Sequence, residues 1–232
     1  MANLFTSHDI IGQIVTKFPK SADTFKAYKI DFCCGGNIPL SEACQAKNIS
    51  ADEVIEKINS AYTKAKELNE EITDFTLLSS SELVDYIIQT HHNFLNEEFP
   101  ALSPYVTKVL RVHGANHPHL LKVHRLFSEL NAEMVEHMIQ EETIDFPTIL
   151  SYEENPSEEL KLKVKTITDN LLEDHQRTGD ILAELREITN DFTPPEGACR
   201  TFQLVYNRLQ AIEEDVHQHV HLENNILFER FI

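Results

Sequence analysis

Two stretches of the chain place apolar residues at alternating steps of three and four, the spacing that lines one face of a helix. The first reads Leu, Val, Phe, Leu, Met, His, Glu, Ile at positions 120, 123, 127, 130, 134, 137, 141 and 144. The second reads Phe, Val, Leu, Ile, Val, His, Glu, Ile at positions 202, 205, 209, 212, 216, 219, 223 and 226. Each helix therefore carries a His-x-x-x-Glu pair, His137 with Glu141 and His219 with Glu223, on the face that its apolar neighbours bury.

These pairs require an explanation because a carboxylate buried without a partner is costly, or becomes protonated. A hydrogen bond in the core explains one such pair. Two matching pairs in two helices favour metal ligation instead. His217 and His221 are also four residues apart, but they fall off the apolar face and are not predicted as ligands.

Two further helices are expected to supply one histidine each. Between positions 157 and 188, His175 is the only histidine on the apolar face. In the stretch from 82 to 98, His92 follows one apolar face and His91 follows a rival one, and the periodicity favours His92. The predicted ligand set is thus four histidines and two glutamates from four helices.

Helix start and stop signals divide the chain into two parts. Short helices are expected at 7–18 and 21–28 and from Ser41 and Ser50, giving a small helical domain at 1–70. A polar linker covers about 68–80. Residues 79–232 then form a second domain with long helices to about Glu98, at about 119–142, at 157–188 and at 198–231, and Pro100 is expected to end the first. A short helix at about 105–113 follows Pro100. The predicted fold is all-α, with a four-helix bundle in the second part.

Composition excludes several classes of function. The net charge of −18 argues against binding to nucleic acid or to an anionic membrane surface. No apolar run is long enough to cross a bilayer, and the first residues lack a signal peptide's layout, so a cytoplasmic location is expected. The adjacent residues Cys33 and Cys34 would form a strained disulfide, which fits a reducing compartment.

Imidazole and carboxylate ligands without thiolate suit iron, manganese or zinc. Two ions with six protein ligands leave coordination positions open, and each glutamate can bridge both ions. A bridged di-iron centre of this kind binds small molecules such as O2 or NO. Ferritin-like bundles use Glu-x-x-His, so the His-x-x-x-Glu order indicates a different group.

The second part resembles haemerythrin-like di-iron domains, which carry this His-x-x-x-Glu pairing. The first part resembles a short domain with a Cys-Cys-Gly-Gly motif, here within Asp-Phe-Cys-Cys-Gly-Gly at 31–36. Together they resemble the RIC (repair of iron centres, ScdA-type) family over nearly the whole chain. The family spacing to Pro100 selects His92 over His91. One departure is Glu229, where the family usually has proline, and it lies beyond the predicted ligands.

The resemblance implies a haemerythrin-like bundle with two iron ions, bridged by carboxylates and open to an oxo bridge. It implies these metal ligands: His92, His137, Glu141, His175, His219 and Glu223. It implies repair, by iron donation, of iron–sulfur proteins damaged by nitric oxide or oxidants, as an iron donor rather than a turnover enzyme. The family also implies a homodimer.

Cys33 and Cys34 are expected on a tight exposed turn, because the two following glycines permit backbone conformations closed to other residues. We interpret them as redox or iron-transfer thiols; the alternative is packing as small apolar residues. Three other functions stay open: reversible O2 or NO binding or sensing, reduction of NO to nitrous oxide, and, least favoured, di-zinc hydrolysis.

Overall fold

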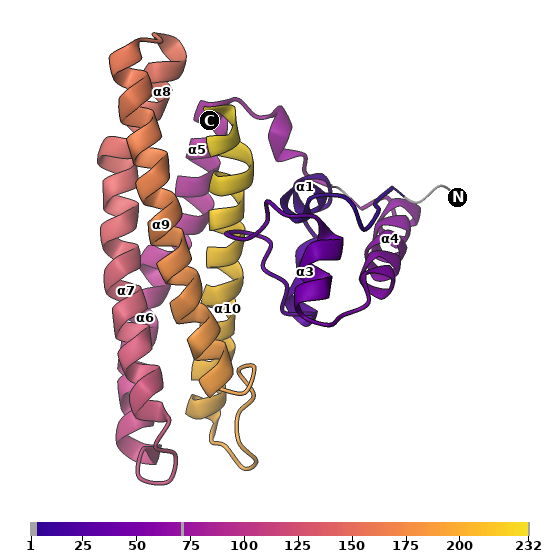
Figure 1. Cartoon of the computed structure of the whole chain (residues 1–232). Helices are drawn as coiled ribbons and strands as arrows, with labels where there is room; N and C mark the ends of the chain where they lie inside the picture. The colour runs from indigo at the N-terminus through magenta and orange to yellow at the C-terminus, as the bar shows by residue number, and fades with distance from the viewer. Residues whose placement is uncertain (1–3, 71, 232) are drawn as a thin grey trace. The chain divides into compact units, whose positions relative to one another are not determined.

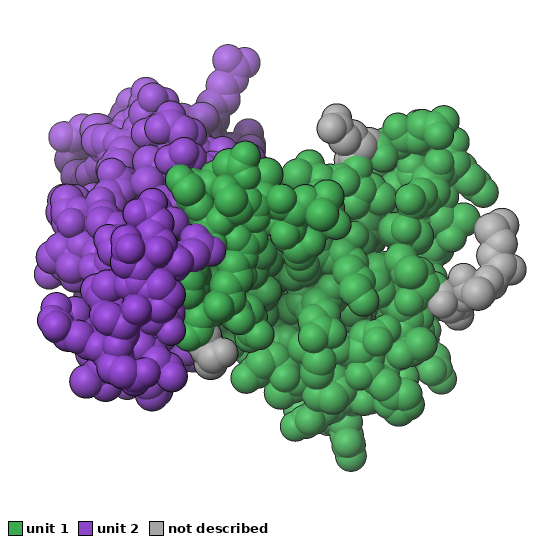
Figure 2. All heavy atoms as spheres, turned by 90° about the horizontal axis from the view of Figure 1, so that it is seen from above, with its two compact units in different colours: residues 1–83, 220–232 green, residues 84–219 purple. Residues whose placement is uncertain are grey.

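A computed structural model of the chain describes residues 4–70 and 72–231. Within them the regular structure is helical, with one isolated bridge between Ile10 and Pro39, and the all-α prediction is confirmed. The chain forms two compact units, coloured in Figure 2: residues 1–83 with 220–232, and residues 84–219. No helix in the described ranges is long and apolar enough to span a membrane.

The N-terminal part of the first unit contains four helices, close to the predicted positions. They are α1 (Ile11–Lys17), α2 (Ser21–Ala27), α3 (Leu40–Ala46) and α4 (Ala51–Glu67). The predicted cap of α4 is present, because Ser50 Oγ accepts a hydrogen bond from the Glu53 backbone N–H at 3.3 Å. The core beneath these helices is rich in phenylalanine and isoleucine, among them the fully buried Phe25 and Ile58.

The predicted linker is partly ordered. A short helix, η1 (Phe75–Leu77), lies within it, and the Phe75 side chain is buried. The side chains of Ser79 and Glu82 then form the reciprocal bonds of a capping box at the next helix.

Four long helices build the bundle and run side by side in Figure 1. Between them, polar pairs join α6 to α10 through Glu98 and Arg208, and α9 to α10 through Arg186 and Glu213. The helical segments of this part are α5 (Ser80–Ile87), η2 (Ile88–His92), α6 (Asn93–His113), α7 (Leu120–Gln140), η3 (Glu141–Asp145), α8 (Phe146–Glu154), α9 (Glu158–Ile188), α10 (Arg200–Leu222), η4 (Glu223–Leu227) and η5 (Phe228–Arg230).

The prediction that Pro100 ends a helix is wrong, because α6 continues through Pro100 and Pro104 to His113. Each proline removes one backbone donor. Both are exposed and four residues apart, so the affected carbonyls lie on one solvent-facing line where water can hydrate them. The buried side of α6, with Phe99 and Val106, holds the helix together.

The helix that was predicted to end near Glu142 also runs further. It passes through η3 into α8 without a break, and Pro147 lies at the junction of η3 and α8, where it removes one backbone donor. The start of α9 is as predicted, because Ser157 caps it through the Leu160 backbone N–H.

Within the first unit, the end of the chain packs against the Cys33–Cys34 turn. The Cys33 carbonyl accepts a hydrogen bond from Asn225 Nδ2 at 3.0 Å, and the Phe32 carbonyl lies 3.4 Å from His221 Nδ1. Gly12 permits a close approach, since a Cβ there would lie 2.1 Å from Asn225 Oδ1. These contacts explain why residues 220–232 belong with the N-terminal helices.

Candidate metal centre

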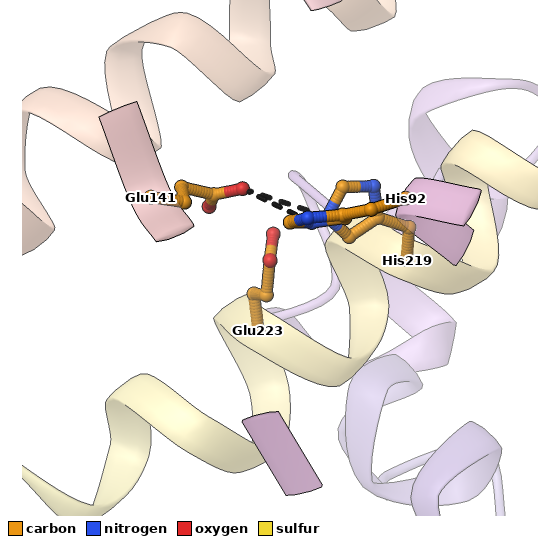
Figure 3. A group of neighbouring side chains, drawn as sticks. All are labelled: His92, Glu141, His219 and Glu223. Atoms are coloured by element: carbon orange, nitrogen blue, oxygen red, sulfur yellow. Dashed lines mark hydrogen bonds and ion pairs between the residues drawn. The ribbon is translucent and has the colours of Figure 1, made fainter. Parts of the chain in front are cut away.

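The structure brings all six predicted ligands together in two groups. His92, Glu141, His219 and Glu223 form the first, drawn in Figure 3, and their ligand atoms lie within 4.8 Å of one another. The second group meets the same limit and contains His137, Glu141, His175 and Glu223. Both glutamates belong to both groups, so each carboxylate lies close to histidines of both groups.

Helix geometry sets these positions. Glu141 follows His137, and Glu223 follows His219, by one turn of a continuous helix. Three π-helical segments in the described residues each contain one of the six side chains: η2 ends at His92, and η3 and η4 begin at Glu141 and Glu223. A π turn inserts an extra residue and rotates the face that follows, a feature that often marks functional sites.

The distances between donor atoms are those of neighbouring ligands on one ion. His92 Nε2 lies 3.2 Å from His219 Nε2, and His137 Nε2 lies 3.2 Å from His175 Nε2. Glu141 Oε2 lies 3.2 Å from His137 Nε2 and 3.4 Å from His92 Nε2. Two ligand atoms at about 2.1 Å from an ion lie about 3.0–3.4 Å apart. The imidazole and carboxylate donors therefore fit a metal.

The side chains of the two groups differ slightly in burial. The side chains of His92, His219 and Glu141 are fully buried, whereas the His137 side chain is 8% exposed. His137 lines a pocket of about 460 Å³ together with four carboxylates: Glu133, Glu136, Asp145 and Asp174. Burial raises the pKa of Asp145 to about 6, because water solvates the carboxylate only partly there.

The outer nitrogen of His92 is fixed by a carboxylate. Nδ1 lies 2.8 Å from Glu142 Oε1, so Nδ1 carries the proton and Nε2 is left to act as a ligand. Sequence reasoning missed Glu142. Its signal is its place beside Glu141, at a helix position that faces away from the apolar stripe.

Two histidines outside the predicted set are buried as well. His91 pairs with Asp215 at 2.9 Å, and its ring stacks on that of His219. His221, which was dismissed for falling off the apolar face, is buried beneath Phe32, and this desolvation lowers its pKa to about 4. Neither belongs to a metal-binding group in the part of the chain that the structure describes.

The cysteines differ in exposure. Cys33 is buried and Cys34 is half-buried, so the expectation of an exposed turn is wrong for Cys33. Asn224 and Asn225 pack here and donate hydrogen bonds to the Cys33 backbone carbonyl. All four cysteines are thiols, and Cys44 lies in the core.

Comparison with known proteins agrees with this architecture. Residues 83–231 match the family described as Hemerythrin HHE cation binding domain, and residues 7–62 match ScdA_N, a domain of unknown function (DUF542). The chain is 40% identical to the "Iron-sulfur cluster repair protein ScdA" of Staphylococcus haemolyticus (strain JCSC1435), over 98% of this chain and 100% of the relative. The chain belongs to the ScdA/YtfE family of iron–sulfur cluster repair proteins.

Members from other bacteria match over similar lengths. The "Iron-sulfur cluster repair protein YtfE" of Escherichia coli O8 (strain IAI1) is 31% identical, over 95% of this chain and 94% of the relative. The "Probable iron-sulfur cluster repair protein" of Haemophilus influenzae is 29% identical, over 96% of each. The family resemblance drawn from the sequence is confirmed, and the buried His/Glu cluster, which lies within the residues that match the haemerythrin domain, suggests a metal site.

Proposed function

We propose that this protein repairs damaged iron–sulfur clusters by donating iron, which it holds as a pair of ions in the bundle. The proposed ligands are His92, His137, Glu141, His175, His219 and Glu223. The observation that carries the proposal is the sharing of Glu141 and Glu223 by both donor groups. A carboxylate has two oxygens, so each glutamate can serve two ions at once.

The number of protein ligand atoms favours the release of iron as well as its binding. Each group offers four protein ligand atoms, whereas non-haem Fe(II) sites commonly leave positions open beyond their histidine and carboxylate ligands. The chemistry that bound iron supplies is Lewis acidity and one-electron exchange. The fold buries Glu141 and Glu223 away from water and places His137 beside the acidic pocket.

Several finer points belong to the same proposal. The damage repaired is that caused by nitric oxide or oxidants, the clients are iron–sulfur proteins, and the site of action is the cytoplasm. Residues 1–70 and 79–232 act as separate functional domains. The active form is a homodimer, which light scattering of the iron-loaded protein tests directly.

A reactivation assay tests the central claim. A [4Fe–4S] enzyme inactivated by nitric oxide is incubated with iron-loaded protein, a thiol reductant and sulfide, and its activity is followed. We expect recovery beyond that from an equal amount of free Fe(II). The variant Glu141→Leu, which exchanges a buried charge for an apolar residue, should fold but fail to bind the iron pair.

Matched controls separate this proposal from its alternatives. Glu129→Leu, an exposed change on the same helix, should leave recovery intact. Recovery no better than with free Fe(II) contradicts the proposal. A stable, reversible NO adduct without iron loss would instead favour a binding or sensing protein, and nitrous oxide production would favour an NO reductase.

A further inference from the structure

Asp31, Cys33 and Cys34 form a second cluster of ligand atoms, within 4.8 Å of one another and separate in composition from the bundle centre. The Cys33 and Cys34 sulfurs lie 3.7 Å apart, and Cys33 Sγ lies 3.3 Å from Asp31 Oδ1. We propose that these three side chains bind one thiophilic divalent cation, with Asp31 as the third ligand.

The sulfur separation supports this assignment. A disulfide requires about 2.05 Å between sulfurs, so the two thiols are well outside bonding distance. Two thiolates on a tetrahedral ion, each about 2.3 Å from the metal, lie about 3.8 Å apart. The turn therefore already holds its sulfurs at the separation that one shared ion needs.

The backbone around the cluster is held from both sides. Asp31 Oδ1 accepts hydrogen bonds from the backbone N–H groups of Cys33 and Cys34, at 2.9 and 3.1 Å, and Oδ2 accepts one from Gly35 at 2.8 Å. From the other side, Asn225 binds the Cys33 carbonyl. The sulfurs are thus carried by a turn with little freedom, which reduces the entropy lost on binding an ion.

The two glycines are part of this construction. A Cβ on Gly35 would lie 3.0 Å from Asp31 Oδ2, and a Cβ on Gly36 would lie 2.4 Å from the Phe32 carbonyl oxygen. A side chain at residue 35 would therefore push the Asp31 carboxylate by a few tenths of an ångström, and one at residue 36 would force the backbone itself to shift.

The Asp31 carboxylate binds the turn through both of its oxygens. An ionised carboxylate offers about four acceptor positions, which three backbone N–H groups and the Cys33 S–H occupy. Replacing the Cys33 proton by an ion would free one of these positions for that ion. Asp31 is exposed and Cys34 is half-buried, so an ion can reach the cluster from solvent. Three protein ligands with an open fourth position describe a site that exchanges its ion, unlike a closed structural site.

The chemistry of the donors selects the ion. Two thiolates favour Fe(II), Zn(II) or Co(II) over Mg(II) or Ca(II). Binding replaces two S–H bonds by two metal–sulfur bonds, so each ion taken up releases two protons to solvent. The hydrogen bond with Cys34, burial and the neighbouring Asp31 carboxylate raise the pKa of Cys33. A role for this site in passing iron to a client rests on the proposed function. The binding of an ion rests only on the geometry of the turn.

Cobalt is the probe that tests the site. The full-length protein, with its bundle loaded with iron, is titrated with Co(II), and thiolate-to-cobalt charge-transfer absorption is recorded. His and Glu ligands give no such band, so cobalt exchanged into the bundle does not interfere. We expect one equivalent of thiolate-bound cobalt, no such band in Cys33→Ser, and at least tenfold weaker binding in Asp31→Asn.

Controls distinguish the loss of a ligand from misfolding of the turn. The side-chain amide introduced by Asp31→Asn retains an oxygen that accepts from the Cys33 and Cys34 N–H groups but loses the acceptor of the Gly35 N–H. Unchanged amide NMR signals for residues 33 and 34 verify that this part of the turn is kept. Cys44→Ser and Cys199→Ser should bind cobalt as the parent does. Equal binding by Asp31→Asn, or no charge-transfer band in the parent, overturns the proposal. The reactivation assay is not involved, so either proposal can fail alone.

Discussion

The Nδ1 atom of His92 lies 2.8 Å from Glu142 Oε1, and Glu142 directly follows the shared carboxylate Glu141. One chain segment thus supplies both a predicted ligand and the group that orients another ligand. Because the two residues point to different sides of the helix, a single π-helical start at Glu141 positions both.

Removing Glu142 should weaken metal binding without unfolding the bundle. Partners of this kind contribute about 10–100-fold to metal affinity, so we expect a loss in that range for Glu142→Ala. Glu142→Gln can still accept a hydrogen bond from His92 Nδ1–H but lacks the charge. Its metal affinity should lie between those of the parent and the alanine variant. Competition against a chromophoric iron chelator gives the affinities, with Glu129→Gln as the exposed control. Unchanged affinity in Glu142→Ala would show that His92 needs no such support.

The two His-x-x-x-Glu pairs could be selected from sequence as candidate ligands because they interrupt an otherwise apolar face. In the last helix every position of that face is buried, from Phe202 to Ile226. In the earlier helix the same pattern fails after Glu141, and Ile144 is 49% exposed. Ile144 lies within η3, where Asp145 and the following Phe146 are the buried residues instead.

The burial of His221 could not be predicted from the helix that carries it. Periodicity describes one face of a helix against one core. His221 faces the Cys33–Cys34 turn, and its neighbours Thr16 and Phe32 precede it by 205 and 189 positions in the sequence. Long-range packing of this kind leaves no local signal.

The buried pair of Arg186 and Glu213 should be important for stability. The guanidinium contacts both oxygens of Glu213, which is 1% exposed, and this pairing raises the pKa of Arg186. Glu213→Leu leaves the partly buried guanidinium of Arg186 with a weaker partner. We expect the free energy of unfolding, measured with urea, to fall by about 3 kcal/mol.

A double variant shows whether the charge or the packing matters. Arg186→Met with Glu213→Leu should recover most of the lost stability, because no unpaired charge is left. The exposed pair Lys165–Asp169 is the control, and Asp169→Asn should change stability by less than about 0.5 kcal/mol. A double variant as unstable as the single one would contradict this account.

The phenol of Tyr206 should make the bundle sensitive to alkali. It lies 2.8 Å from His119 Nε2, and burial raises its pKa from the ordinary 10 to about 12. Between pH 10 and pH 12, the phenol loses its proton in the unfolded chain but keeps it in the folded protein. The contribution of Tyr206 to the free energy of unfolding is therefore complete below pH 10 and declines towards pH 12. At pH 8, Tyr206→Phe should lower the free energy of unfolding by about 1 kcal/mol. Above pH 10, the free energy of unfolding of this variant should decline less than that of the parent. Tyr105→Phe, at a 40% exposed position, should behave as the parent does in urea unfolding at both pH values.

Gly36→Ala should open the cysteine turn. The added Cβ would lie 2.4 Å from the Phe32 carbonyl oxygen, so the backbone must shift where Asn225 holds the Cys33 carbonyl. We expect Cys33, now covered, to react faster with an alkylating agent, as measured by pulsed labelling and mass spectrometry. Gly114→Ala creates a similar clash with the Leu110 carbonyl, but in the other unit. It should lower stability and leave Cys33 labelling unchanged, so faster labelling in both variants would indicate general loosening rather than release of this turn.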